Sequence, residues 1–230
     1  MALYDRDYIN NDYEQAQNSR VNINTFVKQV YQLFAASLLL GGLGAYVGLG
    51  MADVMVSMYW GLVILEIALL VGLYFVKEKP GINLAVFFAF TFVSGLTLTP
   101  LLLRTLNLPG GASIVANSFI LTSVAFAGLS IFAMKTDKDF SSMGKILFVA
   151  LIVIIVASII NIFFGSPILQ LGIACVAAVL FSAFILYDTQ NIINGAYSTP
   201  IEGAIALYLD FLNLFVALLQ IFGILGSSDD

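Results

Sequence analysis

The sequence predicts an all-α integral membrane protein built as a bundle of seven transmembrane helices. Hydrophobic residues make up 60% of the chain and charged residues only 10%. The mean hydropathy of +1.00 lies far above that of soluble globular domains. At about 20 apolar residues per crossing, a chain of this length has room for about seven spans joined by short loops.

Seven stretches are long and apolar enough to cross a bilayer, and each is expected to be a complete helix because lipid offers the backbone no hydrogen-bond partners. Turn signals or charged residues separate most of them, such as those at 109–111 and 165–167. The boundary at 48–53 is weak. The expected spans are residues 28–50, 54–76, 82–103, 113–134, 144–165, 168–190 and 201–225.

One proline lies inside an expected span. Pro100, in the sequence TLTPLLL, is expected to kink the third helix, because proline removes a backbone donor and clashes with the preceding turn. Such a kink is either structural or a hinge.

The chain divides into a polar tail, a membrane domain and a short acidic end. Residues 1–26 are rich in Asn, Tyr and Asp, and they lack the short apolar core and cleavage site of a signal peptide. We therefore expect a cytoplasmic tail at 1–26, a seven-helix transmembrane domain at 27–226 and an acidic tail at 227–230.

The basic residues predict the orientation of the helices in the membrane. With the N-terminus in the cytoplasm, only Arg104 among the 9 lysines and arginines falls outside, where we expect it to be an interfacial anchor. An odd number of spans then places the C-terminus outside. The formal charge of −5 says little about partners, because most of the acidic excess lies in the tails.

The chain has one cysteine, Cys175, and no histidine. A lone cysteine inside an apolar run is expected to be a small buried hydrophobe, and it excludes a disulfide framework and a thiolate metal cluster. The lack of histidine excludes Ser–His and Cys–His hydrolases, His-ligated metals and the usual sensor of pH near neutrality. We expect no enzymatic activity, no resident cofactor and no nucleic-acid partner.

Three carboxylates lie at or within the expected hydrocarbon region: Glu66, Asp188 and Asp210. Ionisable groups in a membrane are costly, so each is a candidate functional residue. Asp188 precedes the turn at 195–200 by seven residues and Asp210 follows it by ten. In an antiparallel hairpin with a rise of about 1.5 Å per residue, the two lie at similar depths in the cytoplasmic half.

The last expected span carries a polar stripe with spacings of 3, 4 and 3 residues, so its members share one face that is expected to point into the bundle. The stripe consists of Asp210, Asn213, Ala217 and Gln220. Asn213 and Gln220 are therefore candidate gate or pathway residues, together with Glu66 and Lys77 on the second span.

The second expected span shows a related spacing. Glu66 and Lys77 lie eleven residues apart, or about three turns, on one face. If this helix lay beside the last one, Lys77 would approach Asp210 and Glu66 would approach Gln220. Lys77 would then close the cytoplasmic mouth of an ion path.

Contact between the two aspartates would make them a pH sensor. Two like charges about 4 Å apart repel by roughly 4 kcal/mol at an effective dielectric constant of about 20. This energy would raise one apparent pKa of the pair by about three units, so the pair would share one proton around physiological pH. Carboxylate oxygens are also suitable ligands for calcium, which makes Asp188 and Asp210 the candidate metal-binding residues.

Structural interpretations of the same residues remain open. Asp188 could be an interfacial acid in contact with water, and Asp210 could be a purely structural hydrogen-bonding group. Glu66 is either protonated and hydrogen-bonded or part of the ion path. Lys77 is either a snorkelling, topology-setting lysine or a gate.

Several motifs resemble those of the transmembrane Bax inhibitor motif family. The sequences LYDTQNI at 186–192 and ALYLDFLNLF at 206–215 are similar to its paired aspartate signatures. SGLTLTP at 94–100 and KTDKDFSSMGKILFVALIV at 135–153 agree with its third helix and its loop between helices four and five. The ending FGILGSSDD is similar to that of the bacterial calcium-leak members. The resemblance covers the chain from the first helix to the C-terminus.

The resemblance implies a seven-helix bundle with the last helix central, and a pH-sensitive passive calcium leak in the inner membrane of a bacterium. Asp188 and Asp210 match the family's pH-sensing dyad, Glu66 its helix-two glutamate and Lys77 a basic residue at the cytoplasmic end of that helix. Where close relatives can carry an arginine on the last helix, this chain has Gln220, so an ion pair with the glutamate is not available. The lipid bilayer, calcium ions and protons are the implied partners.

Two other functions compete with a leak. An aspartyl intramembrane protease would also place aspartates on consecutive helices, and Tyr187-Asp188 agrees with it. However, the second site reads LYLD instead of Gly-x-Gly-Asp, and no Pro-Ala-Leu motif is present. A non-conducting protein that regulates a membrane protease or stress and cell-death signalling is the other alternative, and it would not require a titrating pair of aspartates.

Overall fold

The computed structural model describes the backbone of residues 4–226 and the side chains of residues 22–226. Within this part, seven helical segments are long and apolar enough to cross a membrane, which confirms the predicted helical membrane bundle. The acidic tail at 227–230 lies outside the described residues, as do the side chains of 1–21. The seven segments are Asn22–Gly50, Tyr59–Val76, Ile82–Leu106, Gly111–Lys135, Ser141–Phe164, Pro167–Ile193 and Pro200–Gly226.

The weak boundary near residue 50 contains a short extra helix. Helix α1 (Tyr4–Gly50) is followed by α2 (Ala52–Ser57) and then by α3 (Tyr59–Val76). Met51, between the first two, leaves the helical conformation with a φ of −125° and a ψ of 38°. The predicted start of the second span, in 54–76, was therefore wrong. The helix is interrupted at Met51 and at Met58, and hydropathy does not reveal these interruptions because the sequence on both sides is apolar.

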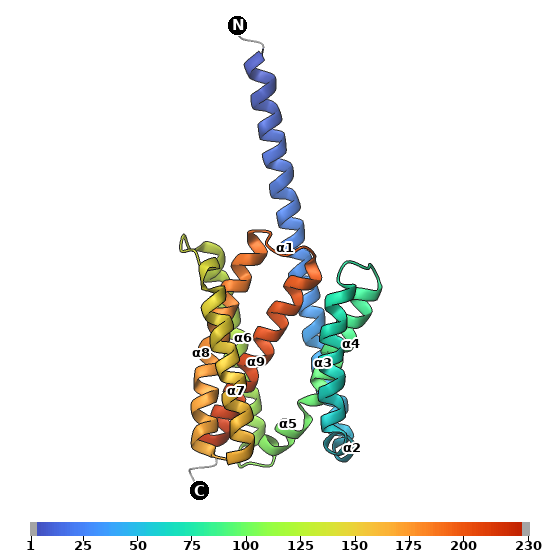
Figure 1. Ribbon diagram of the computed structural model, residues 1–230, viewed down its shortest axis with the longest axis vertical. Helices are drawn as coiled ribbons and strands as arrows, with labels where there is room; N and C mark the ends of the chain where they lie inside the picture. The colour runs from blue at the N-terminus through green and yellow to red at the C-terminus, as the bar shows by residue number, and fades with distance from the viewer. Residues whose placement is uncertain (1–3, 227–230) are drawn as a thin grey trace.

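The predicted kink at Pro100 is confirmed as a break between two helices. Helix α4 (Ile82–Thr97) ends and α5 (Thr99–Leu106) begins on either side of Leu98. Pro100 lies in the first turn of α5, where backbone N–H groups make no hydrogen bond within the helix, so the lack of an N–H costs nothing there. The two helices point in clearly different directions in Figure 1. A hinge at this position stays a prediction.

The second half of the chain forms an up-and-down series of helices with short connections. Helix α6 (Gly111–Lys135) leads through the short helix η1 (Ser141–Met143) into α7 (Gly144–Phe164). Helices α8 (Pro167–Ile193) and α9 (Pro200–Gly226) follow. Gly165 ends α7 with a φ of 60°, a left-handed conformation that glycine adopts at no steric cost. Ser166 then caps α8 by accepting a hydrogen bond from Leu169 N.

Helix α9 packs against α8, α1, α6 and α4. In Figure 1 it runs obliquely between α3 and α4 on one side and α6, α7 and α8 on the other. The buried core of the bundle takes Leu207, Tyr208 and Phe211 from this helix. Within the 18-residue apolar stretch that marks its span, 44% of the residues are buried, the same share as for Ile82–Leu106, so its special position at the centre stays a prediction.

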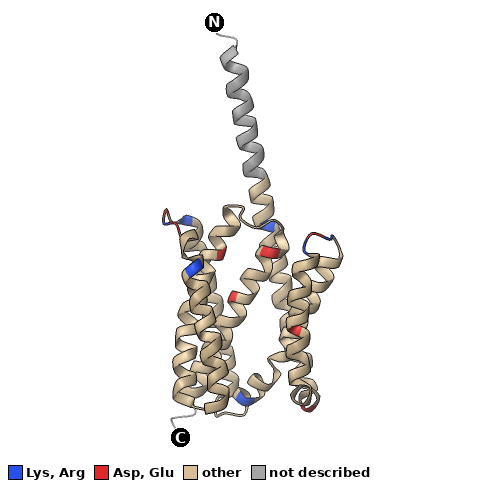
Figure 2. Ribbon diagram, in the orientation of Figure 1, with Lys and Arg blue, Asp and Glu red and all other residues tan. Residues whose placement is uncertain are grey.

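The outer surface of the bundle is apolar, as a lipid-facing surface must be. Phe163 and Ile168 are each 84% exposed. Cys175 also lies exposed on this surface, so its prediction as a buried residue was wrong. A helix that is apolar on every side gives sequence reasoning no means of telling core from lipid. Figure 2 shows that most charged residues of the described part gather at the ends of the helices.

Candidate functional site

The carboxyl groups of Asp188 and Asp210 meet inside the bundle, within reach of a side-chain hydrogen bond. Asp188 comes from the last two turns of α8, and Asp210 from the third turn of α9. The connecting turn contains Gly195 with a φ of 69°, which allows the chain to reverse tightly. The two side-chain positions are only 7% and 4% exposed, so contact with bulk water does not explain Asp188.

Asp188 has a dedicated hydrogen-bond donor in this turn. The hydroxyl group of Tyr197 donates to Asp188 Oδ1 over 2.6 Å, and the Asn191 side chain also contacts the carboxyl group. Burial, together with the negative charge of Asp188, raises the pKa of the Tyr197 hydroxyl group. Tyr197 therefore stays a neutral donor throughout the physiological pH range.

Asp210 is in a poorer environment. Its Oδ2 atom is buried and has no hydrogen-bond partner among the described residues. A buried acceptor without a partner costs about 1–3 kcal/mol, and an uncompensated charge costs more. A proton or a cation shared with Asp188 would relieve this cost.

Lys77 does not contact this pair. Its Nζ atom forms an ion pair with Glu202 Oε1 at 2.5 Å, and it also lies 5.3 Å from the centre of the Tyr74 ring. The proposed approach of Lys77 to Asp210 was therefore wrong. Lys77 lies one residue beyond the end of α3. Glu202 lies in the first turn of α9, about two turns before Asp210.

Glu202 also holds the start of α9. Its Oε2 atom accepts hydrogen bonds from Ser198 N at 2.8 Å, from Ser198 Oγ at 2.5 Å and from Thr199 N at 3.2 Å. In return, Glu202 N donates to Thr199 Oγ1 over 3.4 Å. Thr199 and Glu202 thus form a capping box around Pro200. The sequence TPIE contains this signal, and our sequence reasoning missed it.

The hydrogen bond and the charge of Glu202 raise the pKa of Lys77 above its ordinary value. A lysine with a raised pKa contributes stability that is complete below its unfolded-state value of about 10.4 and is lost only at higher pH. The ion pair therefore does not change between pH 5 and 8. This excludes Lys77 as the titrating group of a sensor near neutrality.

Glu66 belongs to a separate polar group in the middle of the bundle. Its Oε2 atom accepts a hydrogen bond from Thr97 Oγ1 at 2.8 Å. The hydroxyl groups of Ser94 and Tyr208 form a hydrogen bond nearby, and Tyr208 also donates to the carbonyl oxygen of Thr91 over 3.2 Å. Tyr208 is 1% exposed and was missed by the sequence reasoning, although a tyrosine in an apolar helix signals a buried hydroxyl partner.

Gln220 also has a different partner from the one expected. Its Oε1 atom accepts a hydrogen bond from Gln170 Nε2 at 2.6 Å, so the predicted approach to Glu66 was wrong. Asn213 bonds within its own helix, from Nδ2 to the carbonyl oxygen of Leu209 over 2.7 Å. Asp210 and Ala217 of the polar stripe are buried, whereas Asn213 and Gln220 are half-buried. The stripe therefore does not form one continuous hydrogen-bonded path.

The donor set for calcium is small. Among the residues whose side chains are described, no group of three or more His, Cys, Asp or Glu side chains lies together. Calcium takes 6–8 oxygen ligands, about twice as many as two carboxylates offer. The two carboxylates alone would therefore supply only part of the coordination shell of a calcium ion.

Comparisons with known proteins agree with the sequence motifs. Residues 23–227 match the family model described as inhibitor of apoptosis-promoting Bax1. An uncharacterised protein of Campylobacter jejuni is 57% identical over 226 residues, which cover 96% of this chain and 97% of that protein. An uncharacterised membrane protein of Vibrio cholerae is 36% identical over 212 residues, or 90% and 92% of the two chains. The inner membrane protein YbhL of Escherichia coli K12 is 30% identical over 223 residues, or 89% and 93%.

Proposed function

This chain belongs to the Bax inhibitor-1 family of membrane proteins, and on that premise we propose that it is a pH-sensitive passive calcium leak gated by Asp188 and Asp210. The proposal rests on one observation: two buried carboxyl groups from consecutive helices meet in the same half of the bundle. A chain without histidine has few other groups that can titrate near neutral pH.

The pair can exist in two states that favour different arrangements of α8 and α9. With one shared proton, the two carboxyl groups form a hydrogen bond and carry a single negative charge. With no proton, two negative charges face each other, which pushes the helices apart or attracts a divalent cation. Protonation thereby couples to the width of the path and to its affinity for calcium.

The ion pair of Lys77 with Glu202 holds the start of α9 in place while the two aspartates change their protonation. It connects the end of α3 to the first turn of α9, and its charge state does not change in the range where the aspartates would respond. We infer that Lys77 positions the cytoplasmic end of α9 and does not plug the path.

The direction of insertion follows from the basic residues. The turns at 77–81 and 135–140 lie at the end of the bundle that also holds the connection between α8 and α9, whereas Arg104 lies toward the opposite end. In the bacterial inner membrane, the rule for basic residues places the first end in the cytoplasm and the end of α9 outside.

Calcium flux into liposomes that contain the purified protein tests the proposal. We expect flux above that of empty liposomes, with a steep dependence on pH between about 6 and 8. Asp188→Asn and Asp210→Asn should each remove that dependence, because neither leaves two carboxyl groups to share a proton. Asn213→Ala serves as the control, since Asn213 bonds only within α9 among the described contacts, and its pH profile should stay unchanged.

Other outcomes assign other functions. Flux equal to that of empty liposomes would eliminate the leak and favour a non-conducting regulator of a membrane protease or of stress signalling. An unchanged pH profile in both Asn variants would leave a leak with a different sensor. Cleavage of a reporter transmembrane peptide that Asp210→Asn abolishes would instead identify an aspartyl protease.

A further inference from the structure

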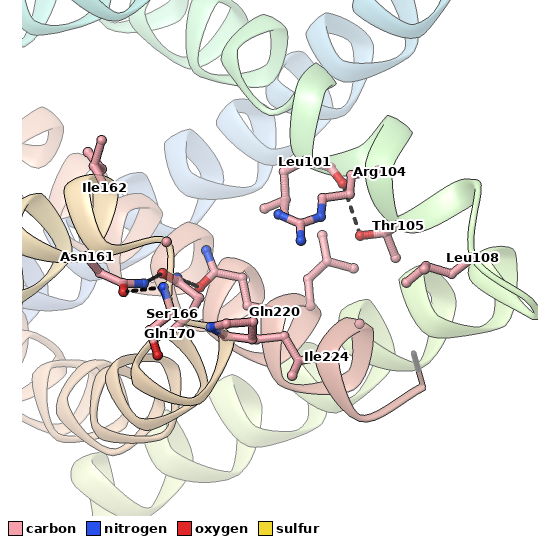
Figure 3. Close-up of a pocket in the computed structure, with 14 residues that line it drawn as sticks. Leu101, Arg104, Thr105, Leu108, Asn161, Ile162, Ser166, Gln170, Gln220 and Ile224 are labelled. Carbon is pink, nitrogen blue, oxygen red and sulfur yellow. Dashed lines mark hydrogen bonds between the residues drawn. The ribbon is translucent and has the colours of Figure 1, made fainter. Parts of the chain in front are cut away.

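A cavity of about 360 Å³ lies at the end of the bundle opposite the aspartate pair. It is bordered by the turn after α5, the turn between α7 and α8, and the last two turns of α9. Figure 3 shows its polar side chains, among them Arg104, Gln170 and Gln220, which come from three different helices. No aspartate or glutamate lines it among the described residues.

A chain of three amide side chains runs along one wall of this cavity, and its direction is fixed at one end. The backbone N–H of Ser166 can only donate, and it bonds to Asn161 Oδ1 at 3.1 Å. The Asn161 amide group must therefore present its Nδ2 atom to Gln170 Oε1, at 2.8 Å. Gln170 Nε2 in turn donates to Gln220 Oε1 over 2.6 Å.

The end of this chain offers a donor to the cavity. Because Gln220 Oε1 accepts from Gln170, its Nε2 atom is left with hydrogens to donate, and it has no acceptor among the described residues. In Figure 3 Gln220 is drawn between Gln170 and Arg104. The backbone amide at one end thus determines which atom Gln220 shows to a ligand at the other.

Two positive features face the same space. Arg104 lines the cavity and has no ion-pair partner among the described residues. Ser166, Pro167 and Gln170 in the wall belong to the N-terminal end of α8, a helix of 27 residues whose dipole favours anions there. Arg104 of α5, Gln220 of α9 and the N-terminal end of α8 thus border one cavity, and no negative side chain among the described residues lines it.

We propose that this cavity binds a phosphate group, held by the guanidinium group of Arg104 and the Nε2 atom of Gln220. Arginine binds phosphate oxygens in a bidentate manner, and the amide nitrogen supplies a further donor. Most of the remaining lining is apolar and includes Leu101, Leu108 and Leu219. The ligand is therefore a phosphate ester with an organic body, either the headgroup of an anionic phospholipid or a free ester.

Binding measurements on the purified full-length protein test this site with two probes. Isothermal titration at constant ionic strength measures the affinity for glycerol 3-phosphate in neutral detergent. Thermal unfolding in nanodiscs of phosphatidylglycerol, compared with phosphatidylcholine, measures the effect of a lipid headgroup. Binding of the first probe identifies a free ester, whereas stabilisation by phosphatidylglycerol alone identifies a lipid, and either supports the site.

Two variants and one control separate this site from general electrostatics. Arg104→Gln removes the charge, and Gln220→Glu keeps the acceptor for Gln170 while replacing the free donor with an oxygen. Each should weaken the affinity for glycerol 3-phosphate by about tenfold or more, or abolish the stabilisation by phosphatidylglycerol. Lys138→Gln makes the same change of charge at the other end of the bundle and should have no effect.

Binding of neither probe, or equal losses in all three variants, would overturn the proposal. Unfolding temperatures without ligand report whether each variant is folded, and Arg104→Lys, which keeps the charge, should retain part of the affinity. The site does not depend on the proposed leak. A protein that conducts no calcium can still bind phosphate here, and a conducting protein can fail to do so.

Discussion

At the scale of single residues, Asp188 and Asp210 differ in what stabilises their ionised forms. Asp188 accepts a hydrogen bond from Tyr197, whereas Asp210 Oδ2 has no partner among the described residues. A proton shared by the pair would therefore belong mainly to Asp210, and Asp188 would be the better site for the remaining negative charge. Tyr197 creates this asymmetry, although it does not titrate itself.

Removal of the Tyr197 hydroxyl group tests its role. A hydrogen bond to a charged group contributes about 1.5–3 kcal/mol, which corresponds to about one to two pH units. Asp188 carries only part of a negative charge while the proton is shared and a full charge once the proton leaves, so in Tyr197→Phe the doubly ionised pair loses more stabilisation than the singly ionised pair. We therefore expect the midpoint of the pH dependence of calcium flux to move upward, by less than this full amount. Tyr187→Phe removes a neighbouring hydroxyl group with no described bond to Asp188, and its midpoint should not move. Equal midpoints in Tyr197→Phe and the wild type would contradict this role.

The sequence was sufficient to pair the two aspartates because both lie on one hairpin, where distance from a turn determines depth. It was not sufficient for the partner of Lys77, which depends on how α3 sits beside α9. The depth of a residue in the membrane does not single out Glu202 as this partner, because its place in a capping box indicates only a local role at the start of α9. Contacts within one hairpin can thus be predicted from sequence. Contacts between distant helices depend on how the helices pack, which the sequence pattern does not give.

At the scale of helices, α1 and α4 approach closely through glycines. A Cβ atom at Gly95 would lie 2.0 Å from the carbonyl oxygen of Gly41, and one at Gly44 would lie 2.1 Å from that of Phe92. Small residues at such positions let helices pack through their backbones in a membrane, where lipid removes the hydrophobic drive for association. The contact joins the first span to the kinked third one.

Substitution of one of these glycines should separate the two helices. Gly95→Ala forces a methyl group against backbone atoms, so we expect a loss of about 1–3 kcal/mol and an unfolding temperature lower by several degrees in detergent. Gly42→Ala is the matched control, since nothing lies within 4 Å of its Cβ position, and alanine in a helix is favoured by about 0.5–1 kcal/mol. If both variants unfolded at the same temperature, this account of the contact would be wrong.

At the scale of the whole molecule, hydropathy predicted how many spans there are but not how they are divided. The count follows from the free energy of transferring apolar helices into lipid, which the composition of each segment determines. The short helix α2 and the break at Leu98 depend on backbone geometry within apolar sequence. Only the break carried a signal, because Pro100 follows it closely.

The orientation of the molecule in the membrane is a further prediction at this scale. Most basic residues lie on segments that reach one end of the bundle, and the translocation of such segments is disfavoured. In a Cys175→Ala background, Asn107→Cys lies in the turn between α5 and α6, and Glu78→Cys lies in the turn between α3 and α4. In intact spheroplasts, a membrane-impermeant maleimide should label Asn107→Cys, whereas Glu78→Cys should react only after permeabilisation. The reverse labelling pattern would indicate the opposite orientation, with the aspartate pair near the outer face of the membrane and the proposed phosphate site at the cytoplasmic face.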